Sequence, residues 1–594
     1  MALDETRRRF LGCCSGMGLG GTLFPGVLWA QIQQDGVQRV TPEMLKSALA
    51  LAGLSFSEAD QKSMLQSVNG SLTRYEEIRD LHIPNNVAPP FYFSALTPGM
   101  KVNRTREPLR FSNPSVKRPA NLEDVAFWPV IQLAQLLKTR QVTSTELTNM
   151  YLARLHKYNE KLNCVVTFLD DVALAQAKQA DAEIAAGKYK GPLHGIPWGA
   201  KDIIAVKGYK TTWGSGAYKD QMLEEEASLV GMLRDAGAVL LAKLTTGELA
   251  QGDQWFGGQT KNPWNPEQGS SGSSAGPASA TAGGLVAFGI GSETSGSILS
   301  PSARCGVTGL RPTFGRISRY GVMALSWTQD RMGPLCRYAE DCAVVMSAIA
   351  RPDNRDLSVS EIPFNFNAHL DVRKLRVGYL DGAFDETRDP VAKKADEQTL
   401  DQVKSLGLKL VPVKVPEWTI DVSSIGVESG VFFDELIRSG RDKEMTNPGR
   451  ANSFRSSRVI PAVEYLQGQR ARSMMMAKLA EATADVDVYL VPANQGGGGG
   501  GRGRGATGGA ATPPGGAGRG RGGGGGNRSV VSRHFSMANL ACYPALNVIN
   551  GFTEAGTPTC ITFYARPFGE AELLAFGKAY QDASGFHQKH PSLA

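Results

Sequence analysis

Three short segments of the chain carry residues that could perform nucleophilic chemistry. The segment 195–202 places Lys201 after an apolar run that contains proline and tryptophan. Apolar surroundings disfavour an ammonium ion, so such a lysine can titrate low enough to act as a base. The segments 270–276 and 289–298 are rich in serine and glycine. Small residues let successive backbone N–H groups converge on one point, and this is how an oxyanion hole forms in acyl transfer.

Other common catalytic motifs are missing from the sequence. It contains no G-x-x-x-x-G-K-[ST], no H-E-x-x-H, and no G-x-G-x-x-G that opens a helix after a strand. Residues 272–276 fit G-x-S-x-G by letter, but no apolar strand leads into them as a nucleophile elbow requires. None of the seven histidines has a Ser-His-Asp context, and His194, next to the lysine segment, is interpreted as structural. Serine-rich loops with a lysine and no histidine favour a Ser–Lys nucleophile system.

These segments resemble the amidase signature family, which hydrolyses amides with a Ser–cis-Ser–Lys triad. The family lysine follows a Gly-hydrophobic-Pro run and precedes aspartate, which corresponds to Lys201. The family block Gly-Gly-Ser-Ser-Gly-Gly corresponds to 271–276, so that Ser273 would be the cis-serine. The family block Gly-Thr-Asp-x-Gly-Gly-Ser-Ile matches 291–298 without a gap and places the nucleophile at Ser297. The likeness spans about 124–590, interrupted by one insertion.

The resemblance also implies an oxyanion hole, and three residues of this segment differ from the family pattern. The N–H groups of Thr294, Ser295 and Gly296 would hold the developing oxyanion, and neither a metal nor an organic cofactor would be needed. The family aspartate of the nucleophile loop is Glu293 here, its first paired glycine is Ser295, and its arginine after Ser-Ile is Leu299. A Cβ at position 295 could narrow the oxyanion hole.

The elements around these segments are typical of a mixed α/β domain. Apolar runs bounded by turn residues predict strands at 165–168, 239–242, 285–290, 375–380 and 486–491. Helical patterns between them begin at 144 and 171. Strands that alternate with helices indicate an α/β fold, and the family resemblance implies a mixed central β-sheet covered by helices. We also expect an N-terminal helical extension.

The N-terminus has the pattern of an export signal. Residues 7–9 are three arginines followed by Phe-Leu, a weakly apolar stretch follows, and 28–30 offers a small residue for cleavage. This resembles a twin-arginine signal peptide at 1–30, which would make the protein exported, periplasmic or otherwise extracytoplasmic in a bacterium. No apolar run reaches the length of about 18–20 residues that a membrane-spanning helix requires.

Residues 31–120 are interpreted as a helical extension with a Pro-rich strap. Thr41-Pro42-Glu43 is a helix start, and a second start follows at Ser57. This region is similar to the small C subunit of the tRNA-dependent amidotransferase, whose A subunit belongs to the amidase signature family. We expect it to wrap and stabilise the catalytic domain, which is placed at 121–594.

The catalytic domain carries a low-complexity insertion at 495–528. It consists mostly of glycine and five arginines, so it cannot bury apolar surface and is expected to be a disordered loop. It contributes +5 of the net charge of +7, and the signal contributes +1, which leaves the rest nearly neutral. The charge therefore gives no reason to expect a nucleic-acid partner. Six cysteines outside the signal are scattered and are expected to be buried thiols.

We expect the protein to be an exported amidohydrolase that acts on a small-molecule amide through an acyl-enzyme intermediate. One alternative is an amidotransferase A-type subunit that acts with a partner on misacylated tRNA. Another is a non-catalytic binding protein that retains the fold. The export signal argues against the former, and the intact triad argues against the latter.

Overall fold

The computed structural model describes residues 40–51, 93–418, 425–457, 462–493 and 529–593, with Ile460 and single residues between 53 and 69. The expected signal peptide at 1–30 and the expected disordered loop at 495–528 lie outside the described residues. The chain divides into two compact units, 1–87 and 88–594.

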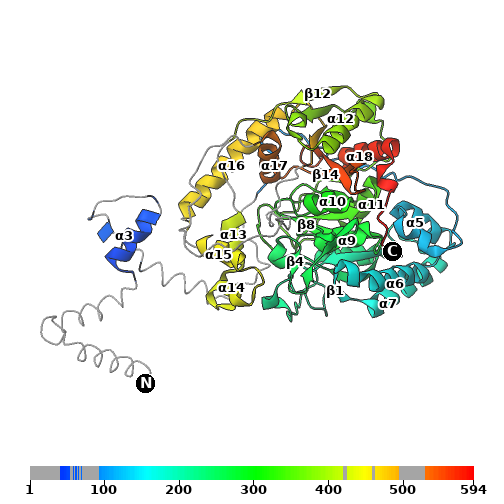
Figure 1. Ribbon diagram of the computed structural model, residues 1–594, viewed down its shortest axis with the longest axis horizontal. Coiled ribbons are helices and arrows are strands. Elements are labelled where there is room, and N and C mark those ends of the chain that lie inside the picture. Colours follow the sequence, from blue (N-terminus) through cyan, green and yellow to red (C-terminus); the bar gives the residue numbers. More distant parts are fainter. Residues whose placement is uncertain are drawn as a thin grey trace, which may run out of the picture. The chain divides into compact units, whose positions relative to one another are not determined.

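The helices and strands follow the labels of Figure 1. The α-helices are α3 Pro42–Leu51, α5 Val130–Lys138, α6 Ser144–Leu162, α7 Asp170–Ala185, α8 Ser228–Asp235, α9 Ala275–Ala282, α10 Leu299–Cys305, α11 Ala339–Ile349, α12 Pro390–Ser405, α13 Ile425–Phe432, α14 Asp434–Arg438, α15 Pro448–Ser457, α16 Ala462–Ala482, α17 Val530–Leu540 and α18 Glu570–Ser584. The strands are β1 Val165–Phe168, β2 Pro197–Lys201, β3 Val239–Leu244, β4 Gln254–Trp255, β5 Gly258–Gln259, β6 Lys261–Asn262, β7 Asn265–Gly269, β8 Phe288–Glu293, β9 Thr308–Arg311, β10 Arg331–Cys336, β11 Val377–Leu380, β12 Leu410–Val413, β13 Val488–Pro492, β14 Ala545–Phe552 and β15 Pro558–Ala565.

The first unit contains the helix that the sequence predicts after Thr41. The Thr41 hydroxyl accepts the N–H of Met44, which caps the helix start of α3. The Asn69 side chain both accepts from the Val40 N–H and donates to the Val40 carbonyl, so it binds the backbone just before α3. A small buried apolar cluster is formed by Leu45, Leu49 and Leu65. These described residues fall within the segment 31–120, and its assignment as a helical extension stays a prediction.

Strap residues from Phe93 onward pack within the second unit. The Phe93 ring meets the Phe314 ring edge-on at 5.2 Å between centroids, and the Arg472 guanidinium lies 3.9 Å from the Phe93 ring centre. Further along, Arg110 pairs with Asn367 in an isolated β-bridge. The strap is therefore anchored to the larger unit by aromatic, cation–π and backbone contacts.

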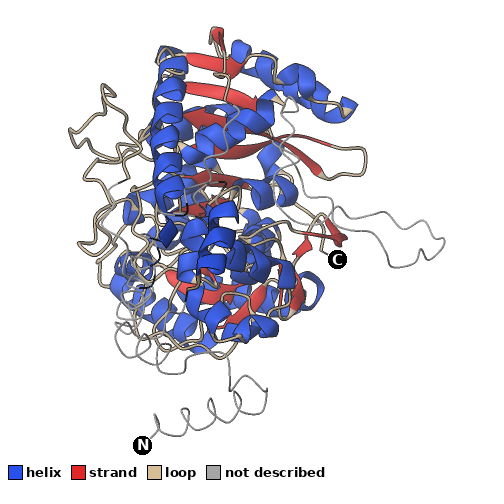
Figure 2. Ribbon diagram, turned by 90° about the vertical axis from the view of Figure 1, so that its left-hand side faces the viewer, coloured by secondary structure: helices blue, strands red, loops and turns tan. Residues whose placement is uncertain are grey.

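The second unit is built on one mixed, eleven-stranded sheet of order β1-β3-β2-β8-β10-β9-β14-β15-β13-β11-β12. Strand β2 runs parallel to both of its neighbours, β3 and β8, whereas β8 runs antiparallel to β10. Helices lie on both faces of the strands in Figure 2. The predicted α/β fold with a mixed, helix-covered central sheet is confirmed. No described helix is long and apolar enough to cross a membrane.

Local sequence explains where most of these elements begin and end. The helix predicted from 144 is α6, and it starts with a complete capping box between Thr143 and Glu146. The strands predicted at 165–168 and 239–242 are β1 and β3. The strand predicted at 285–290 is instead β8, Phe288–Glu293, because residues 285–287 are buried but still belong to the turn after α9: the Leu285 N–H donates to Ala280. Burial and strand pairing are separate properties.

Candidate active site

The lysine of the first motif ends a strand at the centre of one half of the sheet. Every residue of β2, Pro197–Lys201, is buried. Gly199 permits the close packing of β2 on β3, because a Cβ at this position would lie 2.3 Å from Leu244 Cδ1. The apolar run before Lys201 is thus a core strand, and its pairing with β3 and β8 fixes where the lysine side chain emerges.

Lys201 is surrounded by serine hydroxyls. Its Nζ lies 2.8 Å from Ser273 Oγ, 3.1 Å from Ser274 Oγ and 2.9 Å from Ser292 Oγ. The lysine is fully buried, and in the described part of the chain it forms no ion pair with a carboxylate. Burial lowers its pKa to about 7, although the more distant charges of Asp330 and Glu293 act in the opposite direction. A substantial fraction of Lys201 is therefore neutral near pH 7.

The two serine segments are joined by backbone contacts. The Gly272–Ser273 peptide bond is cis, and the Ser273 carbonyl accepts the N–H of Gly247 at 3.4 Å. The Ser274 N–H donates to the Ser297 carbonyl at 3.1 Å. The structure thus brings Lys201 and Ser273 into direct contact and connects Ser297 to this pair through the backbone. Catalytic side-chain hydrogen bonds are often loose before substrate binds.

The expected oxyanion residues form the loop between β8 and α10. Thr294 and Gly296 are buried, Ser295 is exposed, and Ser297 is half-buried. Gly296 has φ +90°, and a Cβ there would approach Ser300 Oγ and the Phe535 ring to 3.1 and 3.2 Å. Only glycine fits this position without strain. Ser295, by contrast, has room for its side chain at the exposed edge of the loop.

Glu293 supports the segment that follows the expected nucleophile. Its Oε2 accepts the N–H groups of Ile298 at 2.8 Å and Leu299 at 3.0 Å, and its Oε1 pairs with Arg311 at 3.0 Å. Burial acts to raise the pKa of this carboxyl, but the charges of Arg311 and Arg331 and the two N–H donors outweigh burial and lower it. The longer side chain, in place of the family aspartate, thus binds the start of α10. Leu299, where the family has arginine, is buried in an apolar cluster with Phe535.

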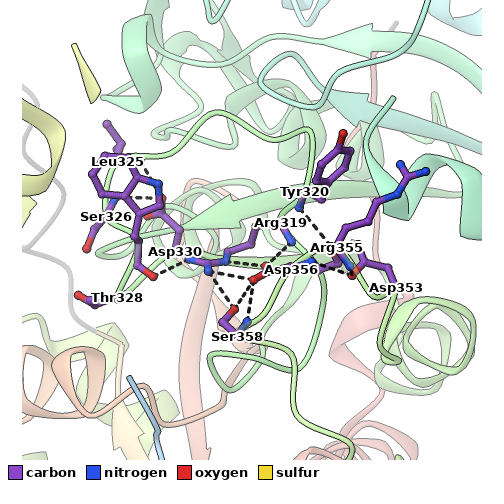
Figure 3. A network of polar contacts seen from close by, with 12 residues as sticks. Arg319, Tyr320, Leu325, Ser326, Thr328, Asp330, Asp353, Arg355, Asp356 and Ser358 are labelled. Atoms are coloured by element: carbon purple, nitrogen blue, oxygen red, sulfur yellow. Dashed lines mark hydrogen bonds and ion pairs between the residues drawn. The ribbon is translucent and has the colours of Figure 1, made fainter. Parts of the chain in front are cut away.

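A second carboxylate holds the other end of this loop. Asp330 Oδ1 accepts from the Thr294 hydroxyl at 2.5 Å, and its Oδ2 accepts the N–H groups of Leu325 and Ser326. Figure 3 shows the Asp330 carboxylate bonded to the backbone of Leu325 and Ser326 in its own loop, and Arg319 lying between that loop and Asp356. The Arg319 guanidinium donates to the Trp327 carbonyl at 2.8 Å and pairs with Asp356. The loop that carries Asp330 is therefore fixed at several points.

The sequence interpretation missed several side chains that support this site. Ser274 and Ser292 lie within the recognised blocks 271–276 and 291–298, but the motifs assigned them no role, and the structure shows that both contact Lys201. Asp330 has no local signal, and a further group, formed by Arg311, Arg331 and Asn539, comes from three separate elements. His194 contacts Glu183 at 3.0 Å and accepts from the Lys190 N–H, consistent with its structural interpretation. The six cysteines outside the signal are buried, as expected.

Comparison with a family model and with known protein sequences identifies relatives of this chain. Residues 146–497 match the family model described as Amidase. The A subunit of the glutamyl-tRNA(Gln) amidotransferase from Geobacter metallireducens is 31% identical over 489 residues, which cover 77% of this chain and 97% of that protein. The protein of the same name from Methylococcus capsulatus is also 31% identical, over 78% and 98% of the two chains.

The fold is also shared with solved structures. The native peptide amidase from Stenotrophomonas maltophilia superposes with a TM-score of 0.66 at 26% identity, covering 79% of this chain and 99% of that chain. A 6-aminohexanoate cyclic dimer hydrolase has the same fold, with a TM-score of 0.64 at 19% identity, over 79% and 99% of the two chains. The match to the family model, the 31% identity over most of both chains and the shared fold show that this chain belongs to the amidase signature family.

Proposed function

We propose that the protein is an amidohydrolase that cleaves a linear carboxylic amide through Ser297, Ser273 and Lys201. The observation that carries this proposal is the position of Lys201, which is fully buried and contacts serine hydroxyls rather than a carboxylate. A lysine held in this way can accept a proton near neutral pH. The family membership supports amide hydrolysis as the general reaction.

In the proposed first step, Ser297 Oγ attacks the carbonyl carbon of the amide. Its proton passes to Ser273 Oγ while Ser273 gives its own proton to neutral Lys201, 2.8 Å away. The carbonyl π electrons move onto oxygen, and the N–H groups of Thr294, Ser295 and Gly296 are proposed to stabilise the resulting oxyanion. Preorganised backbone donors of this kind lower the barrier because they need no rearrangement as charge develops.

In the second step, the oxyanion collapses and the C–N bond breaks. The proton held on Lys201 returns through Ser273 to the leaving nitrogen, which departs as ammonia or an amine. The acyl group remains as an ester on Ser297. Water then attacks this ester with Lys201 and Ser273 again accepting and returning the proton, which releases the acid and restores Ser297.

The test is hydrolysis of a panel of aliphatic amides, anilides and peptide amides by the purified chain from residue 31. Wild type is compared with Ser297→Ala and with Ser347→Ala, which alters a half-buried serine of α11 whose hydroxyl donates to the Val344 carbonyl of its own helix. Turnover that disappears in Ser297→Ala and persists in Ser347→Ala would support the proposal. Turnover retained in Ser297→Ala would contradict the assignment of the nucleophile. No turnover of any amide would favour the non-catalytic alternative.

The names of the relatives support a second candidate function. Proteins named as the A subunit of glutamyl-tRNA(Gln) amidotransferase match this chain over nearly their whole length. In that function the amide would be glutamine, and the ammonia would be passed to a partner protein carrying misacylated tRNA. Release of ammonia from glutamine that depends on added tRNA and partner protein would favour this candidate. Hydrolysis of simple amides by the chain alone favours a small-molecule amide without a nucleic-acid partner.

We also propose that the protein is exported. The support is the sequence of residues 6–12, with three arginines before Phe-Leu, and the small residues near position 30. The full chain, produced in a Gram-negative bacterium, is expected in the periplasmic fraction. Replacement of Arg8 and Arg9 by lysine should retain it in the cytoplasm. A periplasmic fraction free of wild-type protein would contradict export.

A further inference from the structure

The expected oxyanion loop is held by side chains that lie far away in the sequence. Asn539, on α17, donates from Nδ2 to the Thr294 carbonyl at 2.8 Å, across a separation of 245 residues. Arg331 donates to the same carbonyl at 2.9 Å. The Thr294 carbonyl is thus bound from two elements, while the Thr294 hydroxyl is bound by Asp330. Every polar group of this residue except its N–H has a described partner.

The orientation of the Asn539 amide is determined by two guanidinium groups. Its Oδ1 accepts from Arg331 at 2.6 Å and from Arg311 at 3.2 Å, and its backbone carbonyl accepts from Arg331 at 3.3 Å. Two cations on one side leave only the NH2 group to face the Thr294 carbonyl. Asparagine supplies both an acceptor for the arginines and a donor for the carbonyl. Aspartate would keep the first function and lose the second.

The same amide connects the two ends of the loop. Arg311, which donates to Asn539, also pairs with Glu293, and Glu293 binds the N–H groups of Ile298 and Leu299 just after Ser297. Asn539 therefore contacts the beginning of the loop directly and its end through Arg311. Asn539 is 3% exposed, so solvent does not compete for these bonds.

Helix α17 is itself firmly placed. The Ser529 side chain caps it by accepting the N–H of Ser532, and the Glu386 carboxylate accepts the N–H groups of Val530 and Val531. The far end of the helix is held by Arg472, which donates to the Leu540 carbonyl at 2.8 Å. A helix fixed at both ends can hold the Asn539 amide in one position relative to the loop.

We infer that Asn539 is a positioning residue for the oxyanion loop, which it holds in the geometry that the reaction requires. This inference rests on the proposed function. Asn539 is not proposed to touch the substrate; it acts through the backbone of Thr294. Displacement of a catalytic loop by about 1 Å can reduce the rate about 100-fold.

The experiment compares Asn539→Ala, Asn539→Asp and Asn547→Ala with wild type. Asn547 is a matched control because it is fully buried on β14 and also donates from Nδ2 to a backbone carbonyl, that of Val307, at 3.1 Å. Both alanine variants remove a buried amide donor, and Asn539→Ala, which also removes the acceptor of two guanidinium groups, should lose more thermal stability. We expect kcat to fall about 10- to 100-fold in Asn539→Ala with KM within about threefold, and to stay within about threefold in Asn547→Ala.

The aspartate variant distinguishes positioning of the Thr294 carbonyl from hydrogen bonding to the two arginines. Asn539→Asp keeps an oxygen for Arg311 and Arg331 but presents no donor to the Thr294 carbonyl. We expect its kcat to fall as in Asn539→Ala even if its melting temperature is close to that of wild type. Full kcat in Asn539→Asp, or equal kcat losses in Asn539→Ala and Asn547→Ala, would overturn the inference.

A second measurement does not depend on turnover. Amide hydrogen exchange of peptides covering 294–299 should accelerate in Asn539→Ala and Asn539→Asp but not in Asn547→Ala. Unchanged exchange in the Asn539 variants would overturn the positioning role. If wild type hydrolyses no amide, the proposed function fails, and the exchange measurement still decides whether Asn539 holds this loop.

Discussion

Two buried lysines on neighbouring strands differ in their partners. Lys201 ends β2 and Lys243 lies on β3, where it is paired with Ala200 in the parallel register. Both are fully buried. Lys243 Nζ lies 2.8 Å from Asp202 Oδ1 and also donates to the Lys210 carbonyl and the Thr211 hydroxyl. Lys201 has only hydroxyl partners among the described residues. The comparison shows that the hydrogen-bonding partner, rather than burial, distinguishes a structural lysine from a candidate base.

Electrostatics explains why the two sites differ. Burial lowers the pKa of both lysines, but only at Lys243 is burial opposed by a carboxylate in direct contact. An ion pair makes removal of the proton costly, because it would leave Asp202 as an unpaired buried charge. Hydroxyl groups can instead bond either form of the amine, as acceptors from the ammonium or as donors to the neutral nitrogen. The Lys201 site can therefore accept and release a proton without losing its contacts.

The largest expected effect is on activity. Lys201→Met should reduce kcat/KM about 10⁴-fold, because it removes the proposed base while the strand remains packed. Lys243→Met serves as the comparison and should reduce activity only as far as it reduces the folded fraction. The measurement is steady-state hydrolysis, with circular dichroism to confirm folding. Activity of Lys201→Met within tenfold of wild type would end the assignment of Lys201 as the base.

The second expected effect is on stability and has opposite signs at the two sites. Lys243→Met leaves Asp202 buried without its partner and should destabilise the fold by about 3–5 kcal/mol. Combining it with Asp202→Leu should recover most of the loss. Chemical denaturation monitored by fluorescence gives these values. An equally unstable double variant would show that the ion pair matters for reasons other than unpaired charge.

For Lys201 we expect the opposite change in the free energy of unfolding when the lysine is replaced by methionine. Its pKa is near 7 in the folded chain and about 10.5 when unfolded, so between these pH values the unfolded chain holds a proton that the folded chain lacks. The contribution of Lys201 to the free energy of unfolding therefore increases from pH 7 to 10.5. Below pH 7 the lysine is charged in both states, and the folded chain bears the full desolvation cost of the buried ammonium. Lys201→Met should then be more stable than wild type at pH 6. A lower melting temperature for this variant at pH 6 would contradict this account of the lysine.

The third expected effect is on the pH dependence of turnover. If Lys201 must be neutral, kcat/KM should fall about tenfold per pH unit below about 7 and level off above it. The profile of kcat/KM reports the free enzyme, so it can be compared directly with the lysine environment. A rate that is flat from pH 5.5 to 8 would show that no group with this pKa controls the reaction.

The smallest expected effect concerns the hydroxyl surroundings of Lys201. Ser292→Ala removes one of three partners, at 2.9 Å, and should cost about 1 kcal/mol, or about fivefold in kcat. Ser302→Ala is the control, since Ser302 is also buried and its hydroxyl has no partner among the described residues. Equal effects of the two changes would mean that the Ser292 contact is incidental.

Much of the fold could be predicted from the chain because its signals are local. The capping box at Thr143 and Glu146, the apolar run before Lys201 and the turn residues between strands act over a few positions. The predicted limits of the strands were less accurate: the strand expected at 285–290 is β8, Phe288–Glu293. The reason is that an apolar run specifies burial but not hydrogen-bond pairing. The order of the strands could not be derived from these patterns, because it depends on contacts between distant segments.

The sequence alone determined the types of residue at the candidate site and their arrangement in short motifs, from Lys201 to the segment 291–298. Tertiary structure decided which of these side chains meet, and it separated Lys201 from Lys243, two lysines that both follow apolar residues. It also added Asp330 and Asn539 to the site, and neither residue carries a local signal. The physical reason is that hydrogen bonds and burial depend on distance in space, whereas the motifs report only distance along the chain.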